Sequence, residues 1–285
     1  MNWLTAPFQS DFTQRAALVC LFVGVLAPVV GTWVSLRRLA YMGDAMSHSL
    51  LGGVAIAFAI FGSSGVLPGA LVAGIAMAFV IHMLSQNRRI ALDSVIAVVG
   101  SGMFAIGVLA LTKVDTTVSL SHFLFGQLLT VATSDVLITL ALAIASIFFV
   151  WFRFEDLKFA TFDRDHATQV GIKVQRLDLA MLVLLAVCVV VCLSTVGTVL
   201  TVSLLITPTS TARLFFNRVS SITNAAVAIG VTEVMSGFII SYHADLPPGP
   251  TITIATTTVF VLAYIARFTT SERTYIHHSH EHNHH

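Results

Sequence analysis

Long apolar stretches fill most of the chain, and short polar segments separate them. A helix needs about 20 mainly apolar residues to cross a bilayer, and nine stretches approach that length. The pattern therefore predicts an all-α polytopic transmembrane helical bundle of eight or nine spans. The expected spans lie near 16–36, 42–61, 66–84, 92–111, 134–152, 178–194, 196–212, 222–242 and 250–267.

Three places along the chain depart from simple spans joined by short turns. The sixth and seventh spans together occupy only 35 residues and turn around Gly197, so a broken or re-entrant pair is the alternative there. The connection 112–133 is half apolar, which predicts a short re-entrant helix on the outer face. On the other face, the connection 153–177 contains Asp163 as an expected N-cap and Gly171 as an expected C-cap of a short helix.

Composition supports a membrane protein. The 285 residues are 56% hydrophobic and 10% charged, with a mean hydropathy of +0.89, whereas a soluble protein has about 25% charged residues. The net charge of +1 and the three cysteines, which all lie in apolar runs, indicate neither a charged partner nor a disulfide framework. The first apolar run is long enough to span, so we do not expect a cleavable signal. We expect a transmembrane domain over 1–270 and a disordered tail over 271–285.

Basic residues predict the orientation. If the expected spans alternate, thirteen of the 15 Lys and Arg residues fall on one side of the membrane, and only Arg15 and Lys113 fall on the other. Loops rich in Lys and Arg stay in the cytoplasm. We therefore expect a multi-pass protein of the cytoplasmic (plasma or inner) membrane with its N-terminus outside and its C-terminus inside. The thirteen are Arg37, Arg38, Arg88, Arg89, Arg153, Lys158, Arg164, Lys173, Arg176, Arg213, Arg218, Arg267 and Arg273.

Asp44 and His48 are the first candidate site, because charged and polar groups are costly at the mouth of a membrane helix. Four residues apart, they share a helix face and could offer an oxygen and a nitrogen ligand to one cation. Small residues at 43, 45, 47 and 49 indicate close packing around them. The alternative is structural, with Asp44 facing the helix dipole and His48 bonded to a neighbour.

Other polar residues form weaker candidates. Glu233 lies near the centre of an expected span and could line a pathway or make a hydrogen bond to another helix. His243 and Asp245 come just before a proline-rich turn at the outer end of that span, where they form either a cation-attracting vestibule or a plain surface turn. The tail is rich in imidazoles that could bind zinc, nickel or copper. The tail is either native or an engineered tag. The interspersed Ser279, Glu281 and Asn283 favour a native tail. The tail histidines are His277, His278, His280, His282, His284 and His285.

The chain has no phosphate-binding loop of the form G-x-x-x-x-G-K-[ST], and no glycine precedes any of its three lysines. If transport is driven by ATP, another subunit must therefore hydrolyse the nucleotide.

Four stretches together resemble the permease subunits of metal-ion ABC importers, the zinc/manganese/iron family. They are the Arg37-Arg38 to Asp44-x-x-x-His48 signature, LFGQLL at 124–129, FDRDHATQVGI at 162–172 and LLITPTSTARL at 204–214, which is followed by the SYHADLPPGP turn. The resemblance covers residues 15–268. Two departures are His166, where the family commonly has a small or acidic residue, and a more polar closing region at Thr207, Thr209 and Ser210. The tail lies outside the resemblance.

The resemblance implies a homodimeric permease that works by alternating access with a cytoplasmic ATPase dimer and an extracytoplasmic metal-binding protein. It implies no enzymatic activity, no tightly bound cofactor and no nucleic-acid partner. The cargo would be a divalent metal ion that passes Asp44 and His48. It also implies that a coupling helix at 162–172 reaches the ATPase. The residues that the resemblance implies for this coupling helix are Phe162, Asp163, Asp165, Ala167 and Gly171.

The metal stays open between manganese and zinc, with iron also possible, because mixed carboxylate and imidazole ligands suit all three. The outer segment is closer to manganese and iron members, whereas the tail favours zinc. One rival function is a stand-alone proton-coupled metal carrier, with Glu233 and His48 as its proton relay. Another is an assembly protein without a substrate, for which Asp44 and His48 would be dispensable.

Overall fold

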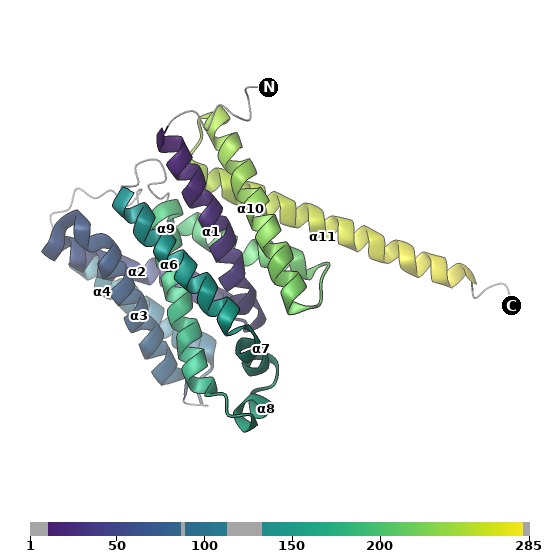
Figure 1. Cartoon of the computed structure of the whole chain (residues 1–285), viewed down its shortest axis with the longest axis horizontal. Coiled ribbons are helices and arrows are strands. Elements are labelled where there is room, and N and C mark those ends of the chain that lie inside the picture. The colour runs from purple at the N-terminus through teal and green to yellow at the C-terminus, as the bar shows by residue number, and fades with distance from the viewer. Residues whose placement is uncertain (1–10, 87–88, 113–132, 282–285) are drawn as a thin grey trace.

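The computed structural model describes residues 11–86, 89–112 and 133–281, and these residues are helical apart from short connections (Figure 1). The all-α class expected from the sequence is confirmed for this part of the chain. Apolar stretches become single helices, and polar or glycine-containing segments separate them. The elements are α1 (Asp11–Leu36), α2 (Ala40–Phe61), the 3-10 turn η2 (Gly62–Gly65), α3 (Val66–Ser85), α4 (Leu92–Leu111), α6 (Thr133–Phe152), α7 (Phe154–Phe162), α8 (Arg164–Gln169), α9 (Val174–Arg213), α10 (Val219–Ala244) and α11 (Pro248–Glu281).

The helices α1 and α9 form the centre of the bundle. The helices α2, α3 and α4 pack on one side of this pair, and α10 and α11 pack on the other (Figure 1). Large side chains such as Trp33 and Leu185 are fully buried in between. At Gly31 a methyl group would overlap the carbonyl oxygen of Leu205, so glycine lets the backbones of α1 and α9 touch.

The helix α9 doubles back at Gly197. Near its start Asp178 pairs with Arg37, and at its end Arg213 donates to Ser35 Oγ, so both ends of α9 reach the C-terminal end of α1. In a straight helix, Asp178 and Arg213 would lie about 52 Å apart. Gly197 has a φ of 83° and a ψ of 173°, a conformation that a residue with a Cβ rarely adopts. The turn that the sequence predicts at this glycine is confirmed.

The number of membrane crossings is only partly established. By length and apolar composition, six described helices could each cross a membrane, or up to seven if α6 and α7, bent by 65°, form one broken span. In this count α9 is a single helix, although it is divided at Gly197. The chain is therefore a multi-pass membrane protein, and the eight or nine spans stay a prediction.

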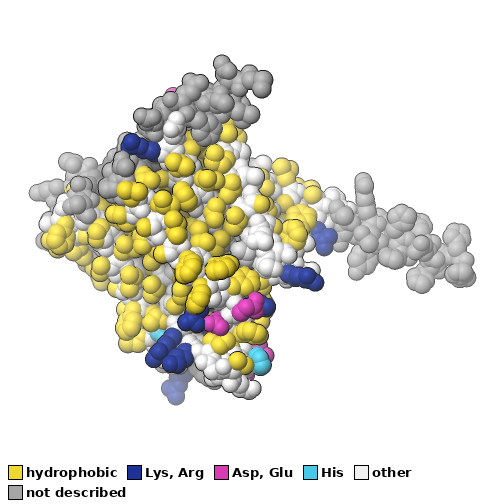
Figure 2. Space-filling model, in the orientation of Figure 1, with side chains coloured by type: hydrophobic (Ala, Val, Ile, Leu, Met, Phe, Trp, Pro, Cys, Tyr) yellow, Lys and Arg dark blue, Asp and Glu magenta, His cyan; other side chains and the backbone are white. Residues whose placement is uncertain are grey.

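The surface agrees with a bundle surrounded by lipid. Apolar side chains cover most of the visible face, and charged side chains gather toward the end that carries α7 and α8 (Figure 2). Exposed apolar residues on separate helices include Val72, Leu109 and Trp151. Such a surface is stable in a bilayer and would aggregate in water.

Two predicted segments lie partly or wholly outside the described residues. The re-entrant helix expected in 112–133 falls in a segment of which only the ends are described. The helix α11 extends away from the bundle (Figure 1) and continues past 267, the expected end of the last span, as far as Glu281. Because the side chains beyond residue 269 are outside the described part, the predictions for the His-rich tail remain untested.

Candidate functional site

The first turns of α2 have a buried face and an exposed face. Met42 and Met46 are fully buried and hold the helix against the core. Tyr41, Asp44 and His48 follow one another at helical spacing on the opposite side, and the side chains of Asp44 and His48 are 48% and 54% exposed. A carboxylate and an imidazole therefore face outward from a helix that is otherwise apolar.

The two polar groups are close enough to share one metal ion. His48 Nε2 lies 3.7 Å from Asp44 Oδ1. A metal about 2.1 Å from each of two ligands can bridge atoms up to about 4.2 Å apart. The His48 ring also meets the ring of Phe104 on α4 edge to face, with centroids 6.5 Å apart. This contact orients the imidazole without using either of its nitrogen atoms.

Close packing fixes this part of α2 on two sides. A methyl group on Gly43 would lie 2.8 Å from Leu205 Cδ2 of α9. On the α4 side, Ser49 Oγ lies 3.0 Å from the carbonyl oxygen of Gly100 and 2.6 Å from that of Ala45. The close packing that the small residues predict around Asp44 and His48 is thus present, and it gives the site a rigid support.

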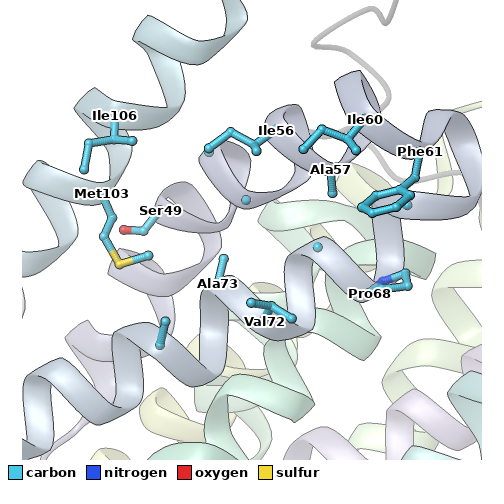
Figure 3. A pocket seen from close by; sticks show the side chains of 15 residues that line it. Ser49, Ile56, Ala57, Ile60, Phe61, Pro68, Val72, Ala73, Met103 and Ile106 are labelled. Atoms are coloured by element: carbon cyan, nitrogen blue, oxygen red, sulfur yellow. The ribbon is translucent and has the colours of Figure 1, made fainter.

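An apolar groove lies next to the pair, between α2, α3 and α4. It has a volume of about 400 Å³ and begins beside Ser49, which supplies the polar side chain of its lining. Ile56, Val72 and Met103 are among the apolar side chains that line it (Figure 3). This lining contains neither carboxylate nor imidazole and cannot bind a divalent cation. Of the groove and the pair, only the pair offers side chains suited to a divalent cation.

Glu233 has a very different environment. The residue is 2% exposed on the buried face of α10, and neither of its carboxyl oxygens has a hydrogen-bond partner among the described residues. One turn earlier Gly230 contacts Pro28 of α1, and one turn later Gly237 contacts Ile252 of α11. Glu233 thus lies where α10 meets α1 and α11.

The structure does not bring Glu233 to the α2 site. The helix α2 packs against α3, α4 and α9, whereas α10 packs against α1, α9 and α11. Nor do three or more His, Cys, Asp or Glu side chains come together as a metal site anywhere among the described residues. Asp44 and His48 therefore offer two ligands in one copy of the chain.

His243 and Asp245 lie at the far end of α10, where both are exposed. Asp245 ends the helix in a left-handed conformation with a φ of 53°, and the His243 ring meets the Tyr242 ring edge to face. The two residues are close in sequence and face solvent, so the structure agrees equally with a vestibule and with a surface turn.

The segment expected to contact an ATPase contains two short helices. Asp163 caps α8 as the sequence predicts, because its carboxylate accepts a hydrogen bond from the backbone N–H of His166 at 2.9 Å. Gly171 follows the C-cap residue Val170 with a φ of 87°, close to its predicted role. Ala167 is buried beneath this turn, and Asp165 is exposed.

The first of these helices, α7, was not predicted from the sequence. Its signals are the acidic residues Glu155 and Asp156 in the first turn and the buried pair Leu157 and Ala160 at helical spacing. Phe162, expected to belong to the coupling helix, is instead the last residue of α7 and is 63% exposed. Phe162 therefore presents an exposed apolar side chain directly before α8.

A group of charged residues that joins this region to the start of α2 was not predicted either. Asp178 on α9 lies 2.7 Å from Arg37, in the turn before α2, and 2.6 Å from Arg164 on α8. Burial lowers the pKa of Arg37, and the charge and hydrogen bond of Asp178 oppose that shift. From the sequence, Arg37 was placed on the positive side of the membrane and in the signature with Asp44 and His48, but its pairing with Asp178 was not predicted.

The described residues form a multi-pass bundle of apolar helices, with an exposed carboxylate–imidazole pair on α2. The chain belongs to the ABC 3 transport family, whose profile matches residues 9–267. Its relatives are membrane permease subunits of ABC transporters and not enzymes, and the ATPase of such systems is a separate subunit.

Two curated relatives and one solved structure illustrate the similarity. The manganese transport system membrane protein MntB of Synechocystis is 33% identical, over 93% of this chain and 86% of that protein. The chelated iron transport system membrane protein YfeD of Yersinia pestis is 33% identical, over 92% of this chain and 88% of that protein. The structure of PsaBC from Streptococcus pneumoniae in complex with Fab has a TM-score of 0.81 at 30% identity, covering 92% of this chain and 94% of that chain.

Proposed function

We propose that this chain forms the translocation pathway of an ATP-driven importer of divalent transition-metal ions. The observation that carries the proposal is the exposed pair of Asp44 and His48 on the membrane helix α2. A carboxylate and an imidazole are costly against lipid, so this face has to meet water or another protein surface. Manganese is the first candidate cargo, supported by the names of the relatives, with iron and zinc as alternatives.

A second copy of the chain completes the site in this proposal. One copy offers one oxygen and one nitrogen ligand, and a symmetric dimer would offer two of each around an axis between the two α2 helices. Four ligands of this kind suit manganese, ferrous iron or zinc. Coordination at the site has to be brief, because a closed cage would retain the ion instead of passing it on.

The proposed orientation has the N-terminus outside and the α7–α8 end in the cytoplasm. The distribution of Lys and Arg supports it, and the doubling back of α9 at Gly197 supports two crossings there. Together with α6–α7 as one span and α2 as another, that would give nine crossings in all. In this orientation α8 and the exposed Phe162 and Val170 would contact a cytoplasmic ATPase. Alternating access would follow ATP binding and hydrolysis in that partner.

The outer end of α10 is the proposed entrance. His243 and Asp245 are exposed there and would attract the cation when an extracytoplasmic binding protein releases it. Glu233 lies outside this proposed route, because its buried carboxyl could reach the metal only if α10 moved relative to α1. The tail histidines would bind zinc in the cytoplasm. Zinc titrations of the 285-residue chain and of a chain ending at residue 270 would test this by comparing the zinc bound to each.

Reconstitution tests the function. Proteoliposomes that contain the chain and its ATPase, with the binding protein added, should take up radioactive manganese only when ATP is present on the side of the membrane that carries the ATPase. The uptake of zinc and of iron, measured in the same vesicles, would show which of the three metals is the preferred cargo. Uptake by the chain alone, driven by a proton gradient, would contradict the proposal and favour the proton-coupled carrier.

A further inference from the structure

Asp178 joins three separate parts of the α7–α8 end of the molecule. Its Oδ1 accepts a hydrogen bond from Arg37 Nη1 at 2.7 Å, and its Oδ2 accepts one from Arg164 Nη2 at 2.6 Å. Each carboxylate oxygen therefore holds a different guanidinium group. Arg164 is the first residue of α8, Asp178 belongs to the first arm of α9, and Arg37 lies in the turn between α1 and α2.

Arg37 is held firmly at this junction. Its side chain is 10% exposed, and its Nε also donates to Thr161 Oγ1 of α7 at 3.0 Å. The next residue, Arg38, has a φ of 59°, which is uncommon for a residue with a Cβ. Only Arg38 and Leu39 separate Arg37 from the first residue of α2. A shift of the Arg37 guanidinium therefore has a short, constrained route to the start of α2.

Neighbouring ion pairs do not link separate helices in the way that Asp178 does. Lys158 pairs with Glu155 at 2.9 Å, and Arg153 pairs with Asp156, but each of these pairs lies three residues apart along the α6–α7 segment. They connect no separate elements. They are also more exposed than Arg37 and Asp178, so water screens them more strongly.

We propose that Asp178 is a positioning residue that couples α8 to α2. In this proposal, which rests on the proposed function, the ATPase moves α8, Arg164 carries the movement to Asp178, and Arg37 passes it to α2. Asp44 and His48 then change their exposure. Asp178 never touches the metal, and its removal leaves both metal ligands and the ATP site of the partner in place.

The coupling ratio, metal ions taken up per ATP hydrolysed, tests the role of Asp178 in the reconstituted complex. We expect Asp178→Asn and Arg164→Gln to lower this ratio at least fivefold while ATP hydrolysis continues, because the ATP site lies in another subunit. Lys158→Gln is the matched control, since it breaks a neighbouring ion pair of no linking role, and it should keep the wild-type ratio. Asp178→Glu should restore most of it.

Each outcome decides the question. Arg164 is 60% exposed, so Arg164→Gln should assemble even if Asp178→Asn does not, and its ratio then gives the result. Unchanged ratios in Asp178→Asn and Arg164→Gln, or an equal loss in Lys158→Gln, would overturn the role of Asp178 while leaving the importer intact. Failure of the wild-type complex to take up metal with ATP would instead overturn the proposed function, and the coupling role with it.

Discussion

The α2 pair and Glu233 are both acidic sites on long, mainly apolar helices, and they differ in exposure and in pairing. Asp44 has an imidazole 3.7 Å away and about half of its side chain exposed, whereas Glu233 is 2% exposed and has no hydrogen-bond partner among the described residues. An exposed, paired carboxylate can exchange a metal ion with its surroundings. A buried, unpaired one must first be uncovered. The comparison therefore supports the proposal of a pathway at α2 rather than at α10.

The strongest way to break this comparison is to remove the α2 ligands. Asp44→Ala or His48→Ala should lower metal uptake by at least about 10-fold, since the loss of even an indirect partner of a metal ligand has an effect of that order. The loss is measured as the uptake of labelled manganese at equal amounts of assembled complex. Tyr41→Phe is the control on the same exposed face. Wild-type uptake in both alanine variants would exclude the proposed site.

A change in the packing of Gly43 against Leu205, next to Asp44, should give the next largest effect. Gly43→Val should crowd the buried Leu205 side chain, which has to shift, and lower the free energy of unfolding by about 1–3 kcal/mol, the usual result of overpacking. Uptake should fall, though less than in Asp44→Ala. Thermal unfolding in detergent checks the first effect. Gly102→Val is the control, because nothing lies within 4 Å of a Cβ at that position. Equal stability of the two variants would argue against close α2–α9 packing.

Glu233 provides the opposite test. A buried polar group without a partner destabilises a protein by about 1–3 kcal/mol, so Glu233→Met should raise the unfolding temperature and leave uptake close to wild type. Glu233→Gln, of similar size, separates charge from shape. If Glu233→Gln loses as much uptake as Asp44→Ala, then Glu233 belongs to the pathway and the comparison fails.

The smallest effect is expected at the outer end of α10. Asp245→Asn should lower uptake at low metal concentration by about twofold, because an exposed charge contributes less than about 1 kcal/mol. Uptake at saturating metal should stay unchanged, and the difference should shrink in high salt. Measurements across metal and salt concentrations check this. A loss at saturating metal would indicate a ligand rather than an attracting charge.

Much of the fold could be predicted from the sequence. Apolar runs predict the long helices because each must satisfy its own backbone in lipid, and Gly197 predicts the break in α9 because few other residues adopt its backbone angles. The cap at Asp163 follows from its side chain alone. These features depend on neighbours in sequence, which a pattern can reveal.

Features that depend on distant contacts could not be predicted. The spacing of Asp44 and His48 predicts one shared face, but not that this face is exposed. Nothing in the sequence links Asp178 to Arg37 or Arg164, since those residues come together only when α9 packs beside α1 and α8. The helix α7 was missed because a short amphipathic helix resembles a polar loop in composition.

Electron paramagnetic resonance of bound Mn²⁺ tests the central claim most directly. In the reconstituted complex labelled with ¹⁵N-histidine, the wild-type chain should give a hyperfine coupling between manganese and an imidazole nitrogen. That coupling should vanish in His48→Ala and persist in His243→Ala. A coupling that survives in His48→Ala would contradict the assignment of the metal pathway to α2.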